Sequence, residues 1–82
     1  MAATAKERML DMGESFMGKD VSEYLWDLLG ERHQNLLEEA WERGFVSGFP
    51  RDYMMGNISP EDMKTVIEAI YESTSKRDKK NI

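Results

Sequence analysis

The single histidine of this 82-residue sequence, His33, is the side chain best suited to chemistry at neutral pH. An imidazole can bind a metal ion or exchange a proton, but either role needs further polar groups around it. The sequence has no cysteine, and Glu31 is the carboxylate next to His33. We therefore interpret His33 as a solvated residue at a helix start, while its spacing to Leu29 and Leu37 also fits partial burial.

Neighbouring carboxylates are the second group with catalytic potential, because two of them held across a cleft can act as acid and base. The pairs here, Glu38-Glu39 and Glu61-Asp62, are adjacent in the chain. Adjacent residues on a helix point in different directions, so neither pair qualifies. Glu38, Glu39 and Glu42 instead predict an acidic helix face, which is either simply solvated or a rim for a basic partner.

Phosphate and calcium sites are not indicated. The segment 44–48 lacks the lysine and the spacing of a P-loop, and the segment 52–57 lacks the alternating oxygen ligands that calcium needs. We expect no metal, no cofactor and no enzymatic activity.

Charge is distributed unevenly. The net charge is −5, and residues 76–80 hold four basic side chains and one acidic one. Residues 1–75 therefore hold 7 basic and 15 acidic side chains, a balance of −8. Phosphate backbones repel such a body, and we expect no binding to nucleic acid.

Length and composition predict one helical domain over residues 1–75 and a disordered basic tail over 76–82. The first ten residues contain no apolar run, and no stretch is long enough to span a membrane. Together with the lack of cysteine, this favours a soluble cytoplasmic protein. So small a chain buries a limited core, which favours a homo-oligomer or a partner that completes the fold.

The predicted fold is all-α, a small bundle of four helices over about 4–17, 21–29, 31–44 and 59–74, with a short helical turn near 50–55. Thr4 with Glu7, and Asp20 with Glu23, have the spacing of capping boxes. Ser59 followed by Pro60 predicts the start of the last helix.

Gly30 predicts a break or sharp kink, because the apolar stripes on its two sides do not line up. One long bent helix is the alternative. Helices over 21–29 and 31–44 have the size of a helix-turn-helix, but the second is too acidic for a typical reading helix, although Arg32, Gln34 and Asn35 stand near its start.

Apolar spacing predicts which helix faces are buried. The first helix has a methionine-rich stripe that includes Met12 and Phe16, and Gly13 inside it predicts a weak, adaptable helix. In the second helix, the expected core residues are Val21, Tyr24, Leu25, Leu28 and Leu29. That arrangement places Trp26 near the opposite side, either covered by another element or exposed to a partner, whereas Trp41 falls on a core face.

The segment 45–58 is unusually apolar for a connection between helices. Its side chains either fill a gap in the core or bind another protein. Together with Trp26, the candidate partner-binding residues are Phe49, Tyr53, Met54 and Met55.

The functional hypothesis is a non-enzymatic protein–protein interaction module, a small adaptor, regulator or inhibitor. The acidic rim would steer a basic partner protein. The alternative hypothesis is an acidic mimic of nucleic acid that blocks a DNA- or RNA-binding protein, as mobile elements and viruses encode.

Overall fold

The computed structural model describes residues 4–45 and 47–80, with side chains described through Ser75. Over these residues the chain forms five helices and no strand: α1 (Ala5–Met17), α2 (Lys19–Leu28), α3 (Gly30–Glu42), α4 (Phe49–Met54) and α5 (Pro60–Lys80). This confirms the prediction of an all-α bundle with one additional short helical turn. Within the described part of the chain, no helix combines the length and the apolar character needed to cross a bilayer.

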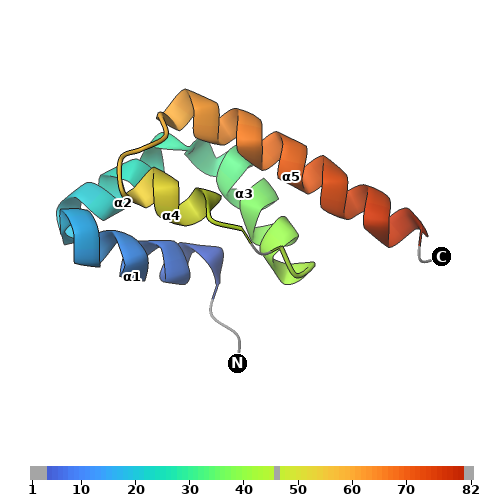
Figure 1. The fold of residues 1–82 in the computed structure, drawn as a ribbon, viewed down its shortest axis with the longest axis horizontal. Coiled ribbons are helices and arrows are strands. Elements are labelled where there is room, and N and C mark those ends of the chain that lie inside the picture. Colours follow the sequence, from blue (N-terminus) through green and yellow to red (C-terminus); the bar gives the residue numbers. More distant parts are fainter. Residues whose placement is uncertain (1–3, 46, 81–82) are drawn as a thin grey trace.

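The helices form a small bundle with α4 in its middle. In Figure 1, α1 lies along one edge of the molecule and α5 along the opposite edge. The main pairings are α1 with α2 and α3 with α5, and α4 contacts both α1 and α5. The C-terminal end of α5 extends beyond the rest of the bundle (Figure 1).

Gly30 separates α2 from α3, as the sequence predicts. Its φ of +80° lies in the left-handed region, which residues with a Cβ rarely adopt. The alternative of a single bent helix is therefore wrong. Gly44 follows the end of α3, and its φ of +90° also lies in the left-handed region.

Two of the three predicted helix starts are confirmed. The Thr4 side chain accepts a hydrogen bond from the Glu7 backbone, and the Ser59 side chain accepts one from the Asp62 backbone, each at 3.1 Å. The predicted cap at Asp20 is wrong, because α2 already begins at Lys19 and Asp20 lies inside its first turn.

The last helix is longer than predicted. We expected it to end near residue 74, but the helical backbone of α5 continues to Lys80. This helical backbone overlaps the predicted disordered tail over residues 76–80, while residues 81–82 lie outside the described part of the chain. The disorder of the tail stays a prediction.

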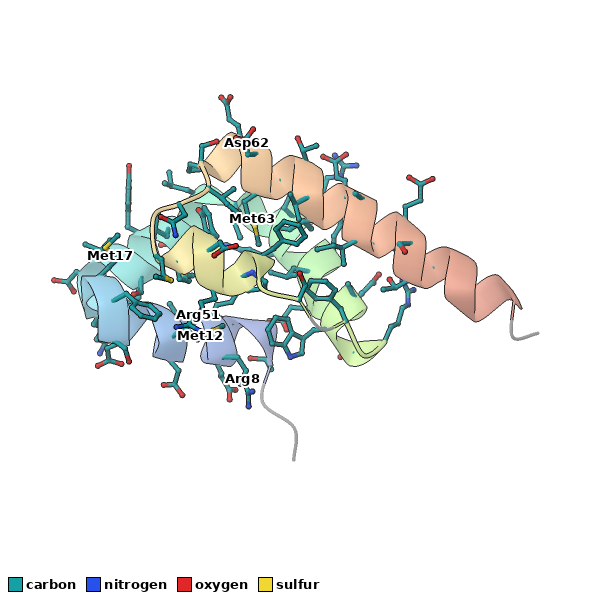
Figure 2. The ribbon with its side chains drawn as sticks, viewed as in Figure 1. Arg8, Met12, Met17, Arg51, Asp62 and Met63 are labelled. Carbon is teal, nitrogen blue, oxygen red and sulfur yellow. The ribbon has the colours of Figure 1, made fainter. Side chains whose placement is uncertain are left out.

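The core lies where α4 meets its neighbours. Figure 2 shows Met63 pointing from α5 toward α4. The buried apolar residues of the core are Ala5, Met9, Trp26, Leu29, Leu37, Tyr53, Met54, Met63 and Ile67.

Gly13 allows α1 and α2 to approach each other closely. A Cβ atom at this position would lie 2.9 Å from the Cβ of Ser22 and 3.0 Å from the sulfur of Met54. Ser22 is itself buried, and its hydroxyl donates to the Gly18 carbonyl at 2.7 Å. The glycine that predicted a weak helix thus lies at a tight contact between α1 and α2.

Candidate functional site

Helix α2 is rotated relative to the prediction. Its buried residues are Ser22 and Trp26, and Leu29 continues the same face at the end of the helix. Val21 and Tyr24, which were expected in the core, are 44% and 62% exposed. The physical reason is that the buried Ser22 packs against Gly13, which turns Val21 and Tyr24 toward the outside.

The rotation of α2 buries Trp26. It is 4% exposed, and its backbone carbonyl accepts a hydrogen bond of 2.9 Å from the Gln34 side chain. The prediction that Trp26 faces a partner is therefore wrong. Trp41, predicted to be core, is only half-buried.

Tyr53 and Met54 belong to the core. Both are fully buried, and the Tyr53 hydroxyl donates to the Leu25 carbonyl. Burial raises the pKa of Tyr53 to about 12, and the nearby Tyr24 adds to this effect. For these two residues the prediction of an outward-facing partner contact is wrong, because α4 is placed between α1 and α5.

The other two candidates of this segment behave differently. Phe49, at the first position of α4, is 41% exposed, and Met55, just after the helix, is half-buried. Their role in binding a partner stays a prediction.

The predicted acidic rim is divided between two roles. Glu39 and Glu42 are exposed, as a rim requires. Glu38 is half-buried, and its two carboxylate oxygens accept hydrogen bonds from the backbone nitrogens of Ala5 and Lys6, at 2.7 and 3.2 Å. Glu38 therefore caps α1 and is not free to steer a partner.

His33 pairs with a carboxylate that the sequence analysis did not associate with it. Its Nε2 atom lies 2.9 Å from Oε2 of Glu68, across the α3–α5 contact. The hydrogen bond from His33 lowers the pKa of Glu68. His33 is half-buried, so the interpretation as a solvated residue is wrong and partial burial is correct.

Among the described residues, no three histidines or carboxylates gather closely enough to hold a metal ion.

The clearest candidate site is a set of exposed apolar side chains where α1 turns into α2. We call Phe16, Met17, Val21 and Tyr24 the α1–α2 corner. Phe16 and Met17 end α1, and Val21 and Tyr24 lie one helical turn apart on α2. All four are exposed. Figure 2 shows Met17 at this outer end of the molecule.

Phe16 and Met17 of the α1–α2 corner lie next to α4 and the turn that follows it. The Arg51 guanidinium stands 5.5 Å from the centre of the Phe16 ring, a cation–π distance. The terminal methyl of Met17 comes within 2.9 Å of where a Cβ on Gly56 would lie. Apolar spacing did not reveal this surface, because it placed Phe16, Val21 and Tyr24 in the core.

A second surface feature is an open groove of about 950 Å³, the α1–α3 groove. It runs between α1 and the C-terminal end of α3, continuing into the loop before α4. Its apolar members, Met12, Trp41 and Phe45, are half-buried, and the two aromatic rings meet edge to face at 6.3 Å. Its polar lining residues are Arg8, Asp11, Glu14, Ser15 and Ser47.

Comparisons with protein-family models, with curated proteins and with solved structures found no match.

Proposed function

We propose that this protein is a non-enzymatic protein–protein interaction module that acts as a small adaptor, regulator or inhibitor. The observation that carries the proposal is the α1–α2 corner. Clustered large apolar side chains on the surface of a small protein are typical of an interaction site, whereas single ones need no explanation.

The chemistry of the corner supports this proposal. Phenylalanine, tyrosine and methionine are enriched in protein interfaces, where they bury much apolar surface. Tyr24 offers in addition a hydroxyl that remains accessible for a hydrogen bond. Helix α2 contributes Trp26 to the core, and Leu29 follows on the same side just after the helix. The outer apolar side of α2 is therefore available for a second protein.

The electrostatics favour a basic partner. Residues 1–75 carry 7 basic and 15 acidic side chains, and such a surface attracts a positively charged protein and speeds their encounter. A second copy of the chain is the other candidate occupant of the corner, since burying it would stabilise a small core. Salt dependence separates this proposal from the alternative of a nucleic-acid mimic. Binding through apolar side chains keeps its affinity as the salt concentration is raised, whereas the binding of an acidic mimic would weaken.

A pair of serine substitutions tests the proposal. The double variant Val21→Ser/Tyr24→Ser removes apolar surface without touching the core, and Ala69→Ser, at an exposed position of α5, is the matched control. Sedimentation velocity and affinity capture from the host lysate compare them with the unmodified protein. We expect the corner variant to lose a dimer or a captured protein that the control retains.

One outcome of these measurements would contradict the proposal. If both variants sediment and capture proteins as the unmodified chain does, while circular dichroism shows equal helix content, the corner is not the interaction surface.

A further inference from the structure

We propose that the α1–α3 groove binds a basic amphipathic segment of another protein, in which leucine-like side chains alternate with lysine or arginine. The inference rests on the lining of the groove and does not depend on the α1–α2 corner. It assigns a second docking surface and the chemical class of its ligand.

The shape of the groove favours a polypeptide segment over a small molecule. Small-molecule sites enclose most of their ligand, whereas this groove is open to solvent along one side. An open apolar groove suits a helix or strand that inserts side chains at regular spacing.

The floor of the groove is held in place by the core. Met12, Trp41 and Phe45 are half-buried, and each packs against the buried cluster. Their positions are therefore fixed before binding, which lowers the entropic cost of association. Tryptophan and methionine are enriched at interfaces, and tryptophan most of all at their energetic centres.

The charged residues at the rim of the groove favour a positively charged ligand. Asp11 and Glu14 line the groove from α1, and both are exposed. Arg8 is the basic residue of the lining, so the two acidic lining residues outnumber it. Cationic side chains flanking the apolar anchors would meet opposite charges here, whereas an acidic segment or a nucleic acid would be repelled.

Two synthetic helical peptides test the proposal. One places lysine between its leucines and the other places glutamate, with the leucines at the same positions. Fluorescence anisotropy of the labelled peptides measures binding to the full chain. We expect the leucine–lysine peptide to bind and the leucine–glutamate peptide not to bind.

Variants then locate the site. Met12→Ala/Phe45→Ala should weaken binding by about tenfold or more, the effect of losing apolar anchors. Because that pair touches the core, Ser15→Lys serves as a second variant, since it adds a positive charge to the exposed rim and should also weaken binding.

A charge-matched control separates the groove from general attraction. Asp11→Asn/Glu14→Gln and Glu61→Gln/Asp62→Asn remove the same charge, but Asp62 lies on the edge of the molecule opposite Arg8 and Met12 (Figure 2). We expect only the first pair to weaken binding. Equal loss from both pairs, binding of the leucine–glutamate peptide, or no binding of the leucine–lysine peptide would each overturn the proposal.

Discussion

Glu38 of α3 holds the start of α1, with its Oε1 atom 2.7 Å from the backbone nitrogen of Ala5. Its second oxygen accepts from Lys6, and the Thr4 side chain accepts from Glu7. The first three backbone N–H groups of α1 therefore all have acceptors. Because a helix N-terminus carries partial positive charge, a carboxylate is well suited to this position. The same contact links the two helices that line the α1–α3 groove.

Substituting Glu38 by alanine should destabilise the protein. Loss of a helix cap with charge-assisted hydrogen bonds costs about 1–2 kcal/mol. Urea unfolding followed by circular dichroism measures the change. The matched control is Glu39→Ala at the exposed neighbouring position, for which we expect a change within about 0.5 kcal/mol. Equal effects of the two substitutions would show that Glu38 does not cap α1 in solution.

Gly13→Ala should also destabilise, although alanine favours a helix over glycine by about 1 kcal/mol. The added Cβ would lie 2.9 Å from the Cβ of Ser22, and overpacking of this kind costs about 1–3 kcal/mol. A double-mutant cycle with Ser22→Gly measures the coupling, because the cost of Gly13→Ala should fall when the Ser22 side chain is absent. A more stable Gly13→Ala variant would contradict the packing described here.

Tyr53 should titrate above the usual range of tyrosine. Its pKa is raised to about 12 in the folded state, so its contribution to stability is fully present below the unfolded value of 10.0. That contribution is lost as the pH rises from 10.0 toward about 12. Unfolding experiments across this range should show the unmodified chain losing more stability than Tyr53→Phe. Identical alkaline profiles would contradict the buried position of the hydroxyl.

The His33–Glu68 pair should stabilise the fold more at neutral than at acid pH. The lowered pKa of Glu68 means that its contribution is present above the unfolded value of 4.5 and disappears as the pH falls through the folded value. Glu68→Gln should therefore destabilise above about pH 5 and lose its effect in stronger acid. In a His33→Ala background the substitution should have little effect. If Glu68→Gln still destabilises the protein in acid, the interaction between His33 and the Glu68 carboxylate is not the cause of its effect.

Local signals predicted the elements of this fold well. Gly30 and Ser59 identify a helix break and a helix start from the residue alone, because left-handed backbone and N-caps have strong residue preferences. Pro50 likewise predicted the short helix α4.

The rotation of the helices could not be predicted in the same way. Trp26 is buried because Ser22 packs against Gly13, a contact between two helices that apolar spacing does not encode. The partnership of Glu38 with Ala5 joins residues distant in sequence, and both candidate surfaces depend on such contacts. The sequence therefore predicted the helices, but neither the α1–α2 corner nor the α1–α3 groove.

Site-specific photo-crosslinking at Tyr24 tests the central claim most directly. A photoreactive phenylalanine analogue is placed at Tyr24, and at Ala69 as the control, in the full chain inside its host. We expect the Tyr24 position to crosslink to one defined protein or to a second copy of this chain, while the Ala69 position does not. No crosslink at Tyr24, or the same products at both positions, would contradict the claim that the α1–α2 corner is an interaction surface.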